Sequence, residues 1–360
     1  MIAGVWAVRP AAASCARLRP IRRISYGRLL TTLSRSQDAP VEHLRRSYLY
    51  VPTSSQKMLM KSLTSQTDVI IYDLEDSVSP FDKDTARERL EGFLTDGSIV
   101  AKLPQSHRIA VRLNALDTPQ FQSDIRQALA LPAIGTLVMP KIHSARDLDH
   151  VSREIYAASR HHPVSAGVAS PIRVVASIES AKGLWSVGDI ASWTSEYGPS
   201  LGGKLSALLF AAEDFCADTS IVRTRSRSEL LYARSRMVIA AKAFGLEAID
   251  MASVCVNYKD KDYLRDECED GRRLGFTAKQ AIHPDQVEVI QTTFVPTEKE
   301  ILRAAKIVHG MAKAHASQIG AIGLDDGKGG KEMIDAPMLK QAKRIVQIAR
   351  AAGVRIPDVS

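Results

Sequence analysis

Residues 68–74 read DVIIYDL, an apolar run with an aspartate near each end, and similar runs recur along the chain. The others are SYLYV (47–51), RIAVRL (108–113), GTLVMP (135–140), IRVVASI (172–178), LSALLFA (205–211), AIDMASV (248–254) and GFTAKQAI (275–282). Most are continuously apolar, as strands buried on both faces are. Amphipathic segments separate them. Eight strands, each followed by a helix, predict an α/β protein with the (β/α)8 TIM-barrel fold.

An open, doubly wound sheet is the competing α/β fold. Such a sheet favours a glycine-rich phosphate-binding turn after its first strand, but here the turn reads PTSSQK (52–57) and has neither GxGxxG nor a Walker signature. The segment SELLYARSRMVIAAKAFG (228–245) is the clearest helix, because it starts with serine and glutamate and closes with glycine. These patterns favour the barrel.

We expect the barrel to occupy residues 45–296 and a C-terminal helical extension to follow over 297–360. Residues 298–317 are typical of a helix, and GLDDGKGG (323–330) indicates a flexible connection. A final helix is predicted over 335–353, with Asp335 at its N-cap and Gly353 at its end.

The positive charge of the chain is concentrated at its N-terminus. The formal net charge is +8, and residues 1–37 contain seven arginines and no Asp or Glu, so the remainder carries only about +1. An arginine-rich, acid-free segment with Ser and Thr is typical of a mitochondrial transit peptide, which we place at residues 1–40 and which implies a matrix protein. We expect no nucleic-acid partner, because the excess charge lies outside the fold.

The sequence also argues against membrane and disulfide classes. No run of about 18 apolar residues is present, so we expect no membrane span. The four cysteines lack CxxC spacing, which indicates neither a zinc site nor a disulfide scaffold.

Titratable residues follow most of the predicted strands, at the face where a barrel of this type has its active site. They are Asp73, Glu75, Asp76, Arg112, Lys141, Glu179, Glu213, Asp214 and His283, together with Asn114. Glu179 and Asp214 follow neighbouring strands, and two carboxylates suit Mg²⁺, which keeps several waters. The alternative is that both residues are helix N-caps. Glu213 is the weaker ligand candidate, because its neighbour emerges further from the strand.

Eight ordered motifs connect the chain to a known family. They are SYLYVPTSSQK (47–57), IIYDLEDSV (70–78), VRLN (111–114), VMPKI (138–142), ASIESAKGL (176–184), AAEDFCADT (211–219), ARSRMVIAAKAFGLEAID (233–250) and GFTAKQAIHPDQV (275–287). Each is weak alone, but the ordered set resembles the citrate lyase β-subunit-like proteins of the HpcH/HpaI aldolase superfamily. The resemblance extends over residues 45–350.

The resemblance implies a carbon–carbon lyase that binds magnesium, coenzyme A and a 2-oxo acid, and that assembles as a homotrimer. It implies that Glu179 and Asp214 are the metal ligands and that Arg112 and Asp335 are catalytic. It further implies a substrate-binding set formed by Tyr50, Lys57, Lys61, Arg112, Ile282 and His283. The loop Thr53–Ser55 departs from the family, whose members usually carry a glycine there.

The expected reaction is the cleavage of (3S)-citramalyl-CoA to pyruvate and acetyl-CoA. Three alternatives stay open: a malyl-CoA lyase or thioesterase, a malate synthase-type activity, and a citrate lyase β-type subunit that acts on an acyl-carrier thioester.

Overall fold

The computed structural model describes residues 43–161, 171–253, 260–325 and 330–359. The predicted transit peptide, residues 1–40, lies outside the described residues, as does Cys255. Cys216 and Cys268 are buried and have free thiols. Within the described ranges, no helix is both long and apolar enough to cross a membrane.

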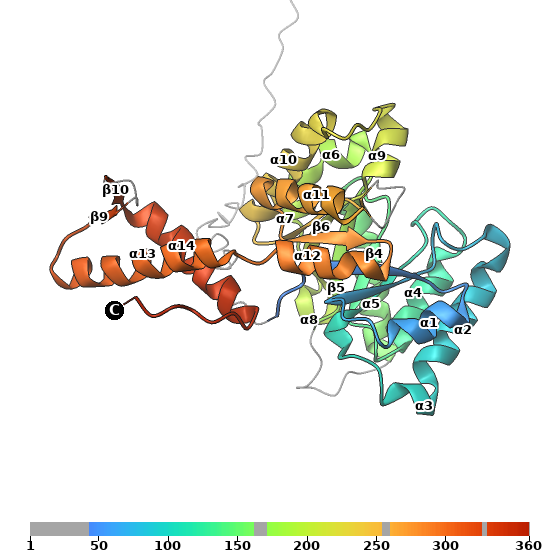
Figure 1. The fold of residues 1–360 in the computed structure, drawn as a ribbon. Coiled ribbons are helices and arrows are strands. Elements are labelled where there is room, and N and C mark those ends of the chain that lie inside the picture. Colours follow the sequence, from blue (N-terminus) through green and yellow to red (C-terminus); the bar gives the residue numbers. More distant parts are fainter. Residues whose placement is uncertain (1–42, 162–170, 254–259, 326–329, 360) are drawn as a thin grey trace, which may run out of the picture. The chain divides into compact units, whose positions relative to one another are not determined.

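Eight parallel strands close into a barrel in the order of the chain (Figure 1). They are β1 (Ser47–Pro52), β2 (Val69–Asp73), β3 (Ile109–Arg112), β4 (Thr136–Met139), β5 (Arg173–Ile178), β6 (Lys204–Phe210), β7 (Glu247–Asp250) and β8 (Ala278–Ala281). The barrel closes where β1 pairs with β8, so that Leu49 lies opposite Ala281. The prediction of a (β/α)8 barrel is confirmed, and the open-sheet alternative is wrong.

Helices follow the strands and form the outer layer. They are α1 (Gln56–Ser62), α2 (Lys83–Thr95), α3 (Gly97–Val100), α4 (Phe121–Ala130), α5 (Ala145–His161), α6 (Ala181–Trp185), α7 (Val187–Ser192), α8 (Gly198–Gly202), α9 (Ala212–Thr219), α10 (Leu231–Ala243), α11 (Lys261–Leu274) and α12 (Val287–Thr293). The helix predicted over 228–245 begins as a 3-10 turn, η4 (Ser228–Leu230), and continues as α10.

The strands are apolar on both sides because the barrel has two separate cores. In β2, Val69 and Ile71 belong to the cluster inside the barrel, whereas Ile70 and Tyr72 pack outward with the helices. Residues that alternate along a strand point to opposite faces, so both faces of each strand are buried. This explains the continuous apolar runs in the sequence.

Four further elements follow the barrel: α13 (Glu298–Ala316), β9 (Ile322–Asp325), β10 (Lys331–Ile334) and α14 (Ala336–Ala351). They share a small core that includes Ile307, Met311, Ile334 and Val346. The helix predictions are confirmed, and Gly353 has a φ of 72°, as a residue that follows a helix end often does.

The connection predicted over residues 323–330 is not simply a flexible link. The described residues on either side of its middle pair as antiparallel strands, with Ile322 opposite Ile334 and Asp325 opposite Lys331. The glycine content of this segment predicted a loop. The pairing of β9 with β10 was missed because it depends on the partner strand and on the burial of the apolar Ile334, which is fully buried.

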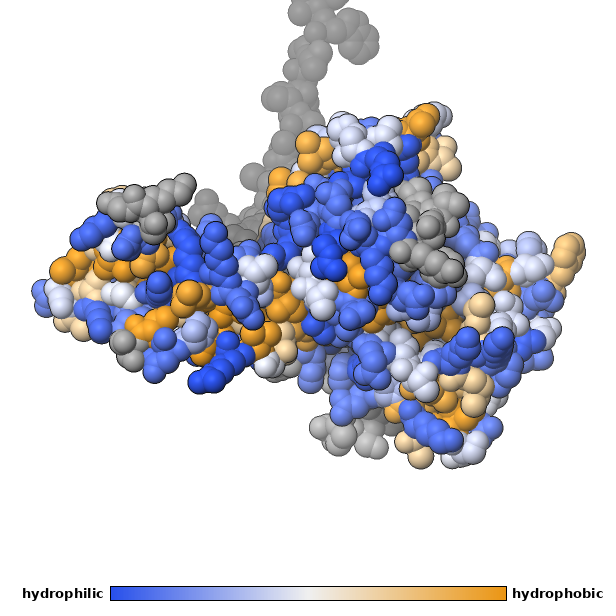
Figure 2. Space-filling model, in the orientation of Figure 1, coloured by the Kyte–Doolittle hydropathy of each residue, from blue (hydrophilic) through white to orange (hydrophobic). Residues whose placement is uncertain are grey.

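Apolar side chains remain exposed on these C-terminal elements. In Figure 2, apolar patches interrupt the hydrophilic surface over α13 and α14, and Leu302, Ile319 and Met333 are all at least 40% exposed.

Candidate active site

Two carboxylates stand at the carboxyl ends of adjacent strands. Glu179 directly follows β5 and is only 4% exposed, and Asp214 lies in the first turn of α9, after β6. Because β5 and β6 pair in register up to Ile178 and Phe210, the two carboxylates enter the same end of the barrel.

The alternative that these residues are helix N-caps is wrong for both. Ser180 caps α6 through its hydroxyl, which accepts a hydrogen bond from the Gly183 amide. Ala211 occupies the N-cap position of α9, and Asp214 lies three residues further along. N-capping therefore does not explain why these two positions are acidic.

Charge crowding and burial perturb both carboxyl groups. Burial, reinforced by Glu75 and Asp214, raises the pKa of Glu179 to about 7. The pKa of Asp214 is also raised, first by burial and then by Asp76. Carboxyl groups perturbed by burial together with a specific charged neighbour are typical of functional sites.

Arg112, the last residue of β3, forms a forked ion pair with Asp73, the last residue of β2. The Nε–Oδ1 and Nη2–Oδ2 distances are both 2.7 Å, and the two residues are register partners in the sheet. Arg112 also lies 3.1 Å from Glu75 and 2.9 Å from Asp76. Burial opposes the charge of Asp73, but the bonds from Arg112 hold the pKa of Asp73 below its usual value.

Lys141 and Glu75 complete this cluster, although the sequence assigned no role to either. Lys141 Nζ lies 2.5 Å from Glu75 Oε1, and Lys141 has a left-handed backbone with φ of 51°. This conformation is uncommon for a residue with a side chain, and such strain concentrates at functional sites. Their position just after β2 and β4 was the signal available in the sequence.

The cluster has a chemistry that suits a divalent cation. In this cluster the carboxyl groups outnumber the cations: Asp73, Glu75, Asp76, Glu179 and Asp214 interact with Lys83, Arg112 and Lys141. The described residues contain no group of three or more His, Cys, Asp or Glu arranged to hold a metal. Magnesium needs only one or two protein carboxylates besides water and substrate oxygens, so the pair Glu179–Asp214 fits it.

Glu213 takes no part in this pair. It is exposed, and its carboxylate forms an ion pair with Arg223.

Three of the expected substrate-binding residues lie in β1 or directly after β8, and these two strands are adjacent in the barrel. The Tyr50 ring centre lies 4.8 Å from the guanidinium carbon of Arg112, and its hydroxyl donates a hydrogen bond to Gln280. Ile282 is 53% exposed. The His283 ring accepts a hydrogen bond from the Asp285 amide and caps the 3-10 turn η5 (Pro284–Gln286).

Lys57 and Lys61 are exposed on α1, one turn apart. The loop before α1 is held by Thr53, whose amide and hydroxyl both donate to the Asp73 carbonyl, and by Ser55, which caps the helix. The departure from glycine in this loop thus provides a link between β1 and the end of β2.

Asp335 caps α14, and its carboxylate accepts a hydrogen bond from the Met338 amide at 3.3 Å. This hydrogen bond joins Asp335 to the first turn of its own helix.

Comparison with known proteins identifies the family. The model of the HpcH/HpaI aldolase/citrate lyase family matches residues 46–284. The chain is 32% identical to the mitochondrial citramalyl-CoA lyase of Mus musculus, over 94% of this chain and 95% of the relative. It is 30% identical to the citrate lyase β subunit of Leuconostoc mesenteroides, over 86% and 95%.

The fold comparison agrees. The citrate lyase β subunit of M. tuberculosis, solved in complex with oxaloacetate and magnesium, is 25% identical, with a TM-score of 0.54 over 72% of this chain and 99% of the other. The chain therefore belongs to the HpcH/HpaI aldolase/citrate lyase family and is a carbon–carbon lyase.

Proposed function

We propose that this lyase cleaves (3S)-citramalyl-CoA reversibly to pyruvate and acetyl-CoA, with Mg²⁺ as its metal. The observation that carries the proposal is the convergence of the Glu179–Asp214 pair and Arg112 in one barrel mouth, where carboxyl groups outnumber cations. Relatives at 30–32% identity are named citramalyl-CoA lyase, and the M. tuberculosis relative holds magnesium with oxaloacetate, which is a 2-oxo acid like pyruvate.

The reaction breaks the bond between a tertiary alcohol carbon and the carbon next to the thioester. Glu179 and Asp214 would hold the magnesium, which supplies Lewis acidity to the oxygens of the hydroxyl and the carboxylate. The Arg112 guanidinium, fixed in place by Asp73, stabilises negative charge on the oxygen that becomes the ketone of pyruvate. The hydroxyl proton passes to water as the ketone forms, and the electrons of the broken carbon–carbon bond pass to the acetyl-CoA fragment as an enolate.

Asp335 is the proposed acid that protonates the carbon of this enolate, and in the condensing direction its carboxylate removes the same proton. Lys57 and Lys61 hold CoA phosphates as point charges, one helical turn apart on α1. Tyr50, Ile282 and His283 line the substrate from the β1–β8 side.

The proposed assembly is a homotrimer in which Asp335 serves the site of a neighbouring subunit. Two observations support it: Asp335 caps α14 in the C-terminal extension and is not on a barrel strand, and apolar residues such as Ile319 and Met333 are exposed on that extension. The proposed domains are a barrel over 45–296 and an extension over 297–360 that carries Asp335.

The proposed location is the mitochondrial matrix, with residues 1–40 as the transit peptide. The arginine-rich, acid-free composition of this segment supports it, and so does the naming of three mammalian relatives as mitochondrial.

A citrate lyase β-type subunit is the second candidate, because the Leuconostoc relative is 30% identical, as is the citramalyl-CoA lyase of Homo sapiens. Malyl-CoA is the nearest competing substrate, since one methyl group in a pocket is worth only about 1–3 kcal/mol.

Steady-state kinetics on citramalyl-, malyl- and 3-methylmalyl-CoA, each with magnesium and with a chelator, test the proposal. We expect magnesium-dependent release of pyruvate and the highest kcat/KM with citramalyl-CoA. Turnover only of an acyl-carrier thioester would favour the second candidate, and turnover that persists in chelator would reject the metal.

A further inference from the structure

Strand β8 presents two polar residues in succession to opposite faces of the barrel wall. Gln280 points into the barrel and is 4% exposed, whereas its neighbour Lys279 points outward and is fully buried. A long polar side chain in each position is costly to bury unless every polar group finds a partner.

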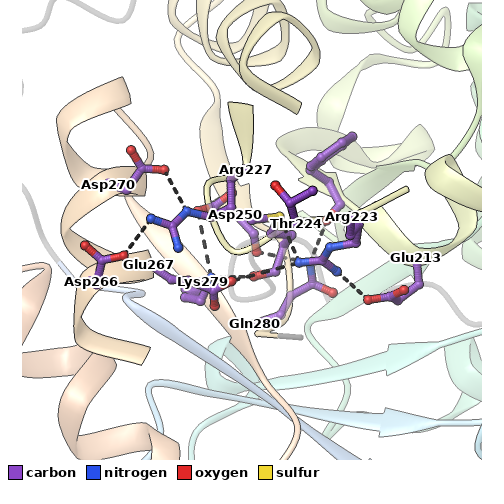
Figure 3. A network of polar contacts seen from close by, with 12 residues as sticks. Glu213, Arg223, Thr224, Arg227, Asp250, Asp266, Glu267, Asp270, Lys279 and Gln280 are labelled. Atoms are coloured by element: carbon purple, nitrogen blue, oxygen red, sulfur yellow. Dashed lines mark hydrogen bonds and ion pairs between the residues drawn. The ribbon is translucent and has the colours of Figure 1, made fainter. Parts of the chain in front are cut away.

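The outer face of β8 is anchored by an ionic cluster (Figure 3). Lys279 Nζ donates to the Met251 carbonyl at 2.8 Å and lies 3.5 Å from Glu267 and 3.9 Å from Asp250. Asp250 in turn accepts a fork of hydrogen bonds from Arg234, at 3.1 and 2.8 Å. These contacts fix β8 against β7 and α11, so the backbone that carries Gln280 has little freedom.

The inner face is held by the amide of Gln280 itself. Its Nε2 donates to the carbonyls of Phe210 at 2.9 Å and Asp250 at 3.1 Å, and its Oε1 accepts from the Tyr50 hydroxyl at 3.1 Å. A carbonyl can only accept, so the two carbonyls require the nitrogen of the amide to face them. The amide oxygen must then face Tyr50. Burial raises the pKa of Tyr50, which keeps its hydroxyl protonated and able to donate.

This amide connects two halves of the candidate site. Phe210 ends β6, four residues before Asp214, and the Tyr50 ring supports the guanidinium of Arg112 at 4.8 Å. Gln280 thus links the strand end that leads to Asp214 with the tyrosine beneath Arg112.

We propose that Gln280 is a positioning residue for the lyase reaction: it sets the position of Tyr50, and through the Tyr50 ring that of Arg112, relative to Asp214. The inference rests on the proposed function. Gln280 acts through its hydrogen bonds and does not touch the substrate. A displacement of about 1 Å in a reacting group can cost about 100-fold in rate, so a small shift of Arg112 is sufficient to be measured.

The test compares Gln280→Leu, Tyr50→Phe and the double variant in the full chain. Gln280→Leu keeps the approximate volume but removes all three hydrogen bonds. We expect kcat to fall about 10-fold to 100-fold in each single variant, with a smaller change in KM. The double variant should be no slower than the slower single variant, because both changes break the same link.

Gln291→Leu is the matched control. Gln291 also donates its amide to several partners, namely Ser47, Gln66 and Asp68, but these lie at the start of the strands, at the opposite end of the barrel from the candidate site. It should lower the thermal midpoint and leave kcat unchanged.

The inference is overturned if Gln280→Leu, like Gln291→Leu, leaves kcat unchanged. It is also overturned if the fall in kcat of the double variant equals the product of the falls in Gln280→Leu and Tyr50→Phe, as expected of independent changes. Should Gln280→Leu fail to fold, an unchanged kcat in folded Tyr50→Phe still overturns it. A wild-type chain that cleaves none of the thioesters would instead reject the proposed function.

Discussion

Arg112 and Asp73 end neighbouring strands and form a fork of two hydrogen bonds, each 2.7 Å long. Their register in the sheet places the two side chains side by side, and Asp73 is 1% exposed. A planar guanidinium matched to a carboxylate is both charged and oriented. Of the candidate residues, Arg112 thus has the best-defined orientation toward the barrel mouth.

Replacement of Arg112 by lysine tests this orientation. Arg112→Lys keeps the charge but loses the fork, so we expect kcat/KM to fall about 100-fold while the fold is retained. Arg272→Lys is a suitable control, since Arg272 pairs with Glu300 outside the site. Steady-state kinetics on both variants measure kcat/KM, and circular dichroism checks that the fold is retained. A wild-type kcat/KM in Arg112→Lys would contradict the proposed role.

Glu179→Gln and Asp214→Asn should each abolish magnesium-dependent activity in a folded protein, because each removes one of the two anionic ligands. Isothermal titration with Mg²⁺ should show affinity reduced about 10-fold or more, in line with the loss of a ligand charge. Glu213→Gln is the control, because Glu213 is exposed and paired with Arg223. Normal turnover of either ligand variant at low magnesium would show that the ligand assignment is wrong.

The raised pKa of Glu179 predicts how the stability of the metal-free protein depends on pH. Between the ordinary value of 4.5 and about 7, folded Glu179 holds a proton that the unfolded chain releases. The contribution of this carboxyl to stability therefore declines as pH rises through that window. In chelator, we expect the thermal midpoint to decrease as the pH rises through this window. Magnesium should counteract the decrease, since it binds the charged carboxylate.

Glu179→Gln isolates this effect, because glutamine does not titrate. The variant should lose most of the pH slope that the wild-type chain shows in chelator. An identical slope in both proteins would mean that other groups cause it.

Asp335→Asn separates a catalytic role from a structural one. Asparagine caps helices about as well as aspartate, so the thermal midpoint should hardly change. Asparagine cannot carry the proton, so kcat should fall about 100-fold or more. Full activity of Asp335→Asn would reject the catalytic role.

Mixed oligomers test the proposed sharing of Asp335 between subunits. Co-expressed Asp335→Asn and Glu179→Gln chains, each inactive alone, should recover part of the activity if one subunit supplies Asp335 to the next. Verified mixed oligomers without activity would place Asp335 in the site of its own chain.

Removal of residues 1–40 should leave a soluble and active enzyme, because the first barrel strand, β1, starts at Ser47, after the deleted segment. The full-length chain fused to a fluorescent protein should be imported into mitochondria, and the truncated chain should not. Cytosolic residence of the full-length fusion would contradict the targeting prediction.

The sequence alone was sufficient for the barrel, because a strand buried on both faces must be apolar at every position and eight such runs alternate with helices. It was also sufficient to place charged residues at strand ends, since that order follows directly from the chain. The cap of α14 by Asp335 was readable for the same reason, because a cap depends on neighbours three residues away.

The tertiary structure decided which of those charges meet. Glu75, Arg112 and Lys141 lie at or just after the ends of three neighbouring strands, β2, β3 and β4, and their contacts depend on strand register and on the left-handed backbone of Lys141. Closure also brings Gln280 of the last strand to Tyr50 of the first, 230 residues away, which no local pattern in the sequence records. The sequence determines which side chains follow each strand, whereas the partners of a buried polar group are determined only when strands that are distant in the sequence pair.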